Sequence, residues 1–281
     1  MSEKMPVGVF TSIGAGLGAD VEGVLGLGLR TVQVHVPPPE MRAPEKIEQT
    51  KKTFADAGID ITVLFCGFAG DNYKSIQIVR ETVGLCPPAT RRERFEELLS
   101  MADYAGALGV PAIGIHIGFV SEDHGSREFS EIVAAAQKVC DRCVDIGLRM
   151  HLETGQETAD TLLAFIGAVD RPNLAVNFDP ANMILYGTGE PIEALKKVGK
   201  YVRSIHCKDG TWADKPGEEW GQEVPLGEGD VGFETYLRTL DEISYVGPLT
   251  IEREIAQEPE RQKKEIGHAI NVLGELKVKI G

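Results

Sequence analysis

One short apolar segment of the chain alternates two kinds of side chain, and this alternation constrains the fold more than any other feature. Successive side chains of a β-strand point to opposite faces of its sheet. One parity is apolar, with Ile113, Ile115 and Ile117, and suits a face covered by helices. The other parity holds Gly114 and His116. A strand covered by helices on both faces would be apolar throughout, so the second face must line something else.

The same alternation recurs in the later strands. Their second parity is polar and closes each time on a residue that can bind a metal: His151 and Glu153, Asn177 and Asp179, Ser204 and His206, Thr250 and Glu252. A polar inner face with such residues at the C-terminal strand ends favours a closed (β/α)8 barrel over an open, doubly wound sheet. Active sites of these barrels lie at the C-terminal ends of the strands.

Short apolar runs alternate with segments of helical period along the whole chain, as is typical of repeated βα units. The predicted strands are Val7–Thr11, Thr31–Val36, Ile59–Phe65, Ala112–Ile117, Leu148–Glu153, Leu174–Asp179, Val202–His206 and Leu249–Glu252. The clearest helices are Pro44–Ala57, Arg91–Leu108 and Ser126–Ile146, the last with an apolar stripe of Phe129, Ile132, Val133, Ala136, Cys140, Cys143 and Val144. No repeat or linker divides the chain, so residues 1–281 are predicted to form a single TIM barrel domain.

The composition narrows the partners. A formal net charge of −14 argues against nucleic acid or an anionic membrane as the main partner, which leaves a small molecule. The five cysteines (Cys66, Cys86, Cys140, Cys143 and Cys207) are too few for a disulfide framework, which favours a reducing compartment. With neither a signal pattern nor a membrane-length apolar run, we expect a soluble, cytoplasmic protein, and a homo-oligomer stays open.

Four strand-end residues form the candidate metal site. Glu153, Asp179, His206 and Glu252 offer three carboxylates and one imidazole, donors that suit Mn²⁺, Mg²⁺, Co²⁺ or Zn²⁺. Any one of them alone would fit a helix cap or a satisfied core histidine. All four at the ends of successive barrel strands predict one divalent metal ion. Glu254 shares the parity of Glu252 and is the alternative fourth ligand.

Four motifs resemble the sugar phosphate isomerase/epimerase family, whose members are xylose isomerase-like barrels. They are Asn-Phe-Asp-Pro-Ala-Asn (177–182), Ser-Ile-His-Cys-Lys-Asp (204–209), Pro-Leu-Gly-Glu-Gly-Asp-Val (225–231) and Gly-Pro-Leu-Thr-Ile-Glu-Arg-Glu (247–254). The resemblance implies that Glu153, Asp179, His206 and Glu252 coordinate one cation. It also implies that Glu153 and Glu252 act as acid and base on opposite sides of a sugar.

The expected activity is carboxylate-mediated proton transfer on a small sugar or sugar-like ketone, through a metal-stabilised enediolate. An inosose-type dehydratase and a hydroxypyruvate-type isomerase begin with the same proton abstraction and stay open. An abasic-site nuclease of the endonuclease IV type would need extra histidines where this chain has Cys66, Asn182 and Gly232. A sugar-binding protein without turnover is a further alternative.

Further residues are predicted near the substrate. His116 ends a strand with inward parity, Asn182 follows Asp179 by three residues, and Lys208 lies just past His206. Gln33 and His35 point inward if the parity of their strand holds. Two long connections, residues 67–90 and 208–232, leave strands at the catalytic end, and the first is expected to lie over the barrel mouth.

Two other motifs are discounted. Residues 14–19 match a relaxed dinucleotide fingerprint, but the acidic residue expected after the second strand is absent. Cys140 and Cys143 have redox spacing, yet both fall on the apolar face of a helix, away from the helix N-terminus where reactive pairs lie. We interpret them as buried structural cysteines.

Overall fold

The computed structural model describes residues 4–12, 20–255 and 258–280. Parallel strands close into a barrel in which each strand pairs with its neighbour along the chain, and β10 closes the ring on β1. The barrel strands are β1 Val7–Ser12, β2 Thr31–His35, β3 Asp60–Cys66, β4 Ala112–Ile115, β5 Arg149–Glu153, β6 Leu174–Phe178, β7 Val202–Cys207 and β10 Leu249–Ile251. This topology confirms the predicted (β/α)8 barrel.

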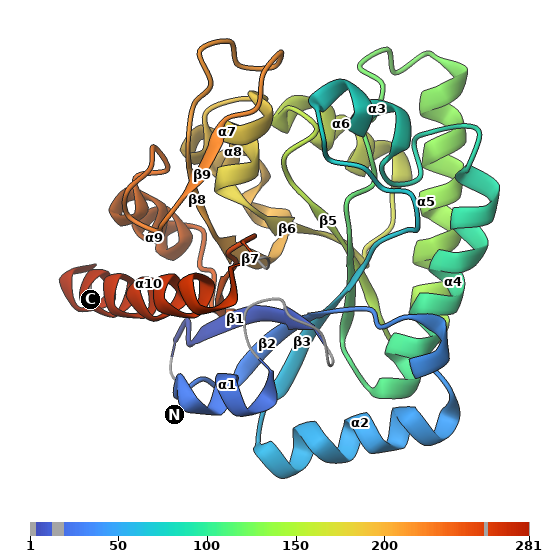
Figure 1. The fold of residues 1–281 in the computed structure, drawn as a ribbon. Coiled ribbons are helices and arrows are strands. Elements are labelled where there is room, and N and C mark those ends of the chain that lie inside the picture. Colours follow the sequence, from blue (N-terminus) through green and yellow to red (C-terminus); the bar gives the residue numbers. More distant parts are fainter. Residues whose placement is uncertain (1–3, 13–19, 256–257, 281) are drawn as a thin grey trace.

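Helices surround the barrel, with the long helices α4 and α5 side by side on one flank (Figure 1). The helices are α1 Val21–Gly26, α2 Pro44–Ala57, α3 Ile76–Thr82, α4 Arg91–Leu108, α5 Arg127–Asp145, α6 Ala159–Val169, α7 Pro180–Tyr186, α8 Pro191–Val198, α9 Phe233–Glu242 and α10 Pro259–Ile280. Two 3₁₀ turns, η1 Pro39–Met41 and η2 Gly199–Tyr201, and a hairpin of β8 Asp209–Thr211 and β9 Gln222–Val224 complete the fold. None of the described helices has the length and apolar character needed to cross a membrane.

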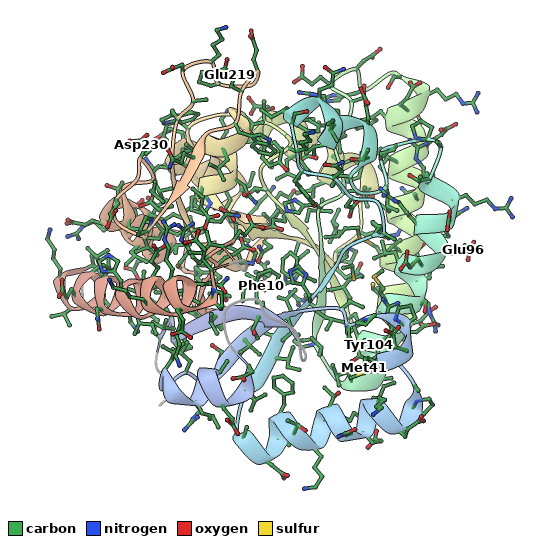
Figure 2. All side chains as sticks on the ribbon, in the orientation of Figure 1. Phe10, Met41, Glu96, Tyr104, Glu219 and Asp230 are labelled. Carbon is green, nitrogen blue, oxygen red and sulfur yellow. The ribbon has the colours of Figure 1, made fainter. Side chains whose placement is uncertain are left out.

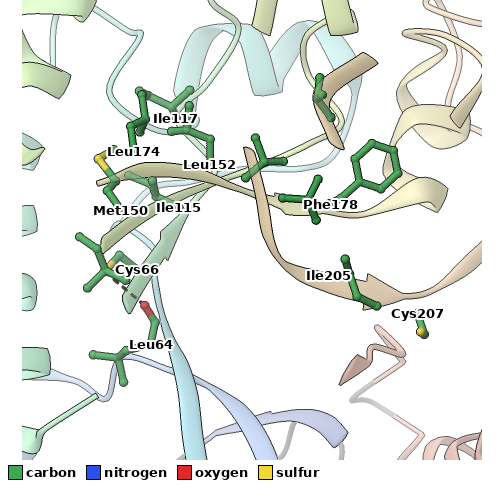
Figure 3. Packing of buried hydrophobic residues seen from close by; sticks show 14 of the residues in the cluster. Leu64, Cys66, Ile115, Ile117, Met150, Leu152, Leu174, Phe178, Ile205 and Cys207 are labelled. Carbon is green, nitrogen blue, oxygen red and sulfur yellow. Dashed lines mark hydrogen bonds between the residues drawn. The ribbon is translucent and has the colours of Figure 1, made fainter. Parts of the chain in front are cut away.

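The parity of the strands separates two buried clusters. The larger one fills the space between strands and helices and includes Ile115, Met150, Leu152 and Phe178 (Figure 3). A smaller cluster of Phe10, Val63, Phe65 and Ala112 is distinct from it, and Phe10 lies at the centre of the barrel in Figure 2. Gly114 leaves room for the Phe65 ring, because a Cβ on it would lie 2.6 Å from that ring. The barrel interior is therefore packed rather than open.

Three strands end earlier than predicted. Strands β4, β6 and β10 stop before His116, Asp179 and Glu252, so these residues begin the loops that follow. Asp179 leaves its strand because it is the N-cap of α7 and its side chain accepts a hydrogen bond from the Asn182 N–H. A residue that caps the next helix cannot also continue the strand pairing.

Helix α5 confirms most of its predicted stripe but corrects one position. Cys140 and Cys143 are fully buried, and burial raises the pKa of each thiol to about 12. Such thiols are unreactive at neutral pH, which fits the structural interpretation. Val144 is predicted on the same face, but it is 56% exposed. It follows Cys143 directly, and a step of one residue turns the side chain about 100° around the helix axis.

The connection from residue 67 to 90 is fixed to the end of β4. The Leu85 N–H donates to the Ile117 carbonyl at 2.8 Å, and Arg94 of α4 donates to the Gly84 carbonyl at the same distance. Gly84 has a φ of +73°, and a Cβ on it would lie 2.3 Å from the Ile117 carbonyl carbon. Only glycine fits here, so this contact holds the long connection against the strand that precedes His116.

Gly84→Ala is expected to lower the free energy of unfolding by more than the cost of placing an alanine at positive φ. Gly58 provides the matched control, because it has a φ of +63° and a Cβ on it would meet no described atom within 4 Å. Gly58→Ala should lower the free energy of unfolding by about 1 to 2 kcal/mol, the cost of left-handed backbone. Gly84→Ala should lower it by about 2 kcal/mol more, because backbone must move. Urea unfolding measures both, and equal losses would contradict the contact.

Candidate metal and substrate site

The four predicted ligands come together at the C-terminal end of the barrel. One donor atom from each of Glu153, Asp179, His206 and Glu252 lies within 4.8 Å of the others, and all four side chains are buried. His206 Nδ1 is central, at 2.8 Å from Glu153, 3.2 Å from Glu252 and 3.5 Å from Asp179. Within the described part of the chain this is the only such group.

Gln33 sets the orientation of the His206 ring from another strand of the barrel. Its Oε1 lies 2.9 Å from His206 Nε2. Its Nε2 faces acceptors, Thr250 Oγ1 at 3.2 Å and Asn177 Oδ1 at 3.4 Å, which assigns the amide orientation. An amide oxygen only accepts, so His206 Nε2 carries a hydrogen and Nδ1 faces the carboxylates; with a metal bound, a neutral ring would offer the Nδ1 lone pair as a ligand. This confirms the inward orientation predicted for Gln33.

Asp179 divides its two carboxylate oxygens between two roles. Oδ1 accepts from the Asn182 N–H at 3.0 Å. The Thr154 hydroxyl holds the Asp179 backbone, because it donates to the Asp179 C=O and accepts from the Asp179 N–H. Oδ2 is buried and makes no hydrogen bond with the described residues, and the same holds for His206 Nδ1. Buried polar atoms without partners are costly unless a ligand satisfies them. These two atoms and the oxygen-rich donor set fit a divalent cation.

Glu153 stands between two imidazole rings. Its Oε2 lies 2.9 Å from His116 Nε2, and its Oε1 lies 2.8 Å from His206 Nδ1. Burial alone would raise the pKa of Glu153, but the rings of His116 and His206 hold it well below its usual range. Asn182 adds a donor to Oε1 at 3.4 Å. His116 and Asn182, both predicted near the substrate, thus contact a predicted ligand.

Lys208 lies beside Glu252, the other glutamate of the ligand group. Its Nζ lies 3.1 Å from Glu252, 2.6 Å from Glu254 and 3.1 Å from Asn182 Oδ1. Burial would lower the pKa of Lys208, but Glu252 and Glu254 raise it well above its usual value, so the ammonium is charged. Of the two candidate fourth ligands, Glu252 belongs to the ligand group, whereas the Glu254 side chain is 56% exposed and contacts Lys208 instead.

A cavity of about 440 Å³ opens beside the four ligands, within the range of small-molecule sites. His116, Asn182 and Lys208 line it, and so does His35, whose pKa burial lowers. Tyr73, Trp220 and Glu223 also line it, and none of these three was predicted. They come from the two long connections, and the only sequence signal for them was the length of those segments. The expectation that residues 67–90 reach the barrel mouth is confirmed at Gly67 and Tyr73.

Two sequence features lie apart from this cavity. His151 points into the barrel below it, 2.8 Å from Ser204 Oγ, and burial lowers its pKa to about 3. It is therefore a neutral histidine of the packed interior. The discounted fingerprint at residues 14–19 lies outside the described residues.

Glu157 is a buried carboxyl group next to the site but outside the ligand group. It lines a second cavity with Gln156 and Arg80, it is 5% exposed, and its Oε1 has no hydrogen-bond partner among the described residues. Burial raises its pKa to about 7, against a hydrogen bond from Val120 that lowers it. Between the ordinary glutamate pKa and about 7, Glu157 therefore stays protonated in the folded state and ionises in the unfolded state. The free energy of unfolding falls as the pH rises through this range.

Glu157→Gln is expected to stabilise the protein at pH 8 and to change little at pH 4. The neutral amide keeps an acceptor for Val120 and removes the cost of an ionised buried group, which for this shift is about 3 kcal/mol. Urea unfolding at both pH values measures the difference. Glu122→Gln, on the rim of the same cavity, is the control. A Glu157→Gln effect independent of pH would contradict the raised pKa.

Gln33→Leu is expected to weaken divalent metal binding by about 10-fold to 100-fold, the usual effect of removing a partner that orients a ligand. Leucine leaves His206 Nε2 without an acceptor, so the ring loses its fixed orientation. Titration of the metal-free protein with Mn²⁺ measures the affinity. Ser204→Ala is the control, because it removes an interior hydrogen bond to His151 without touching a ligand. Equal weakening in both variants would assign the loss to general damage of the interior.

Known proteins share this fold and sequence pattern. The crystal structure of a xylose isomerase domain protein from Planctomyces limnophilus is 52% identical, covers 99% of each chain and gives a TM-score of 0.96. The ketose 3-epimerase of Arthrobacter globiformis is 27% identical over 126 residues, 42% of this chain and 39% of that protein. An inosose dehydratase of Clostridium botulinum (strain Eklund 17B / Type B) is 25% identical over 142 residues, 47% of this chain and 45% of that protein.

The alignments span less than half the length of these last two relatives, so their activities do not transfer directly. Over most of the chain, residues 22–276, the sequence matches the family model described as xylose isomerase-like TIM barrel. The structural match and the family model agree, and the chain belongs to the xylose isomerase-like TIM barrel family.

Proposed function

We propose that the protein is a divalent-metal-dependent isomerase or epimerase of a small sugar or sugar-like ketone. The observation that carries this proposal is the buried group of three carboxylates and one imidazole at the wall of a small-molecule cavity. Ketose 3-epimerases among its relatives support the reaction class. The sugar and the metal are not identified by these observations.

Glu153, Asp179, His206 and Glu252 would hold the metal, which we take to be Mn²⁺, Mg²⁺, Co²⁺ or Zn²⁺. A cation bound there would supply Lewis-acid polarisation of the substrate carbonyl, which makes a neighbouring C–H more acidic. Gln33 and the first turn of α7 orient two of the ligands, so the donor atoms are positioned before the metal binds.

Glu153 and Glu252 are the proposed acid and base. They come from β5 and the end of β10, which flank β6 and β7 in the barrel order and so approach the cavity from different sides. A carboxylate on one side takes a carbon-bound proton, and the other returns one. Return to the opposite face of the same carbon gives an epimer, and return to the neighbouring carbon gives an aldose–ketose isomer.

A dehydratase is the second candidate, and Lys208 favours it. Its buried ammonium lies beside Glu252 and would assist departure of a hydroxyl group by donating a proton after one of its present partners is displaced. Inosose dehydratases and a 3-dehydroshikimate dehydratase also occur among the relatives. Loss of water from the product, rather than a rearranged sugar, would distinguish this activity.

The remaining alternatives have less support. For an abasic-site nuclease, the ligand group holds only one histidine, and the described residues contain no second group of this kind that could complete a trinuclear zinc cluster.

All five cysteines are free, which supports our placement of the protein in a reducing compartment such as the cytoplasm.

Glu153→Gln is expected to lower solvent deuterium incorporation into a ketose substrate by about 100-fold or more, because it removes a group that moves a proton. The assay would use the metal-loaded protein and a panel of ketoses, with the product sugar identified by nuclear magnetic resonance. Metal content would be measured on the same samples. Absence of divalent metal and of deuterium incorporation in the unaltered protein would refute the proposal.

A matched pair of variants assigns the fourth ligand within the same experiment. Glu252→Gln should reduce bound metal, whereas Glu254→Gln should retain it, because the Glu254 carboxylate contacts Lys208 and lies outside the ligand group. Metal loss in Glu254→Gln with retention in Glu252→Gln would reverse the assignment.

A further inference from the structure

The charges around the cavity are unevenly distributed. Four carboxylates line it, from Glu153, Glu223, Glu252 and Glu254, whereas Lys208 is the only lysine or arginine among the described lining residues. The residues that the structure does not describe contain no lysine or arginine, so their side chains cannot add one. An anionic ligand would thus find a single lysine and no arginine in this cavity.

Lys208 is already occupied by partners from the chain itself. An ammonium group has three N–H donors. Lys208 makes three hydrogen bonds, to Asn182, Glu252 and Glu254, and its side chain is 2% exposed. A substrate anion could bind this ammonium only by displacing one of these three partners.

Arg253, which follows Glu252 in the chain, is engaged in the same way. It lies behind Glu223, 2.6 Å from that carboxylate and 2.6 Å from Glu265, and it is 8% exposed. The charge of Glu223 is therefore balanced from behind the cavity wall. Arg253 is not among the residues that line the cavity, so it offers no charge to a ligand inside.

A metal ion in the proposed site does not reverse the excess of negative charge around the cavity. A divalent cation brings two positive charges to a group that holds three carboxylates, those of Glu153, Asp179 and Glu252. A phosphate ester carries about −1.5 to −2 charges at neutral pH and, where it is buried, needs strong donors such as arginine or lysine to offset them. A buried charge without such a partner is strongly disfavoured.

The other lining residues suit an uncharged polyol. Aromatic side chains form much of the wall, namely Phe10, Phe65, Tyr73, Tyr186 and Trp220. Ionised carboxylates only accept hydrogen bonds, so the groups complementary to them are hydroxyl donors. Carbon–hydrogen faces of a sugar ring or chain can pack on the aromatic rings.

We propose that this cavity accepts an uncharged polyhydroxy ketone and rejects phosphate esters and carboxylates, with the Lys208–Glu254 ion pair as the element that excludes anions. The proposal rests on the proposed function for the reaction at the metal end. The substrate proposal goes beyond the proposed function, because it says which of the substrates compatible with the family fold this cavity accepts. Uncharged inososes stay within the accepted class.

Binding measurements test this proposal without relying on turnover. The Mn²⁺-loaded protein would be titrated by calorimetry with free ketopentoses and ketohexoses, each paired with its terminal phosphate ester. At least one free ketose should bind, and each ester should bind about 10-fold or more weakly than its parent, since a single unfavourable charge contact has about this effect. An ester that binds as tightly as its parent, or no binding by any free ketose, would overturn the proposal.

Deuterium incorporation, measured on the same ketoses and on their phosphate esters, separates the two proposals. Binding of a free ketose with no exchange would contradict the proposed function and support the substrate class. Exchange confined to phosphate esters would support the proposed function and overturn the substrate class.

Glu254→Gln tests the ion pair. This change removes one negative charge from the cavity and leaves Lys208 with one anionic partner fewer, so the preference for the free ketose should shrink by about 3-fold to 10-fold. Glu219→Gln is the matched control, because Glu219 lies at the tip of the β8–β9 hairpin, away from the barrel (Figure 2), with a side chain 55% exposed. An unchanged preference in Glu254→Gln would show that this pair does not exclude anions.

Discussion

The site depends on one electrostatic constraint, which is that three carboxylates and an imidazole share a small buried volume. Glu153, Asp179 and Glu252 place oxygen atoms within 4.8 Å of one another with little access to water. Like charges at such distances repel strongly in a medium of low dielectric constant. The chain offsets part of this with His206 and Lys208, whose pKa values the carboxylates raise. A bound divalent cation would offset it more directly, since it satisfies the unpaired donor atoms as well.

The barrel makes this arrangement rigid because the support for each ligand comes from another strand. Gln33 on β2 holds His206 on β7 and also reaches Asn177 on β6 and Thr250 on β10. Side chains from separate strands interlock in layers inside such barrels. The position of His206 is therefore fixed by contacts across the barrel interior, and a change in an interior side chain can affect the site without touching substrate.

The sequence predicted the part of this design that depends on local periodicity. Alternation along each strand is visible in the residues themselves, so the barrel, the inward face and the group of four could be predicted together. What could not be predicted depends on contacts between distant segments. Asp179 was assigned to a strand although it caps α7, and Tyr73 and Trp220 reach the cavity from loops without a periodic pattern. Glu252 and Glu254 have the same parity, and only their three-dimensional contacts distinguish them.

Under the proposed function, the two catalytic glutamates are not equivalent. Glu153 lies against the His116 ring, which can either donate or accept a proton, and His116 is partly exposed in the cavity at 21% of its side chain. Glu252 lies against the Lys208 ammonium, which only donates and is 2% exposed. A proton on Glu153 therefore has a neighbouring group through which it can exchange with the cavity, whereas the ammonium beside Glu252 cannot accept a proton from it. Under the proposed function, the two glutamates would therefore differ in how readily each exchanges its proton with the cavity, in both directions of the reaction.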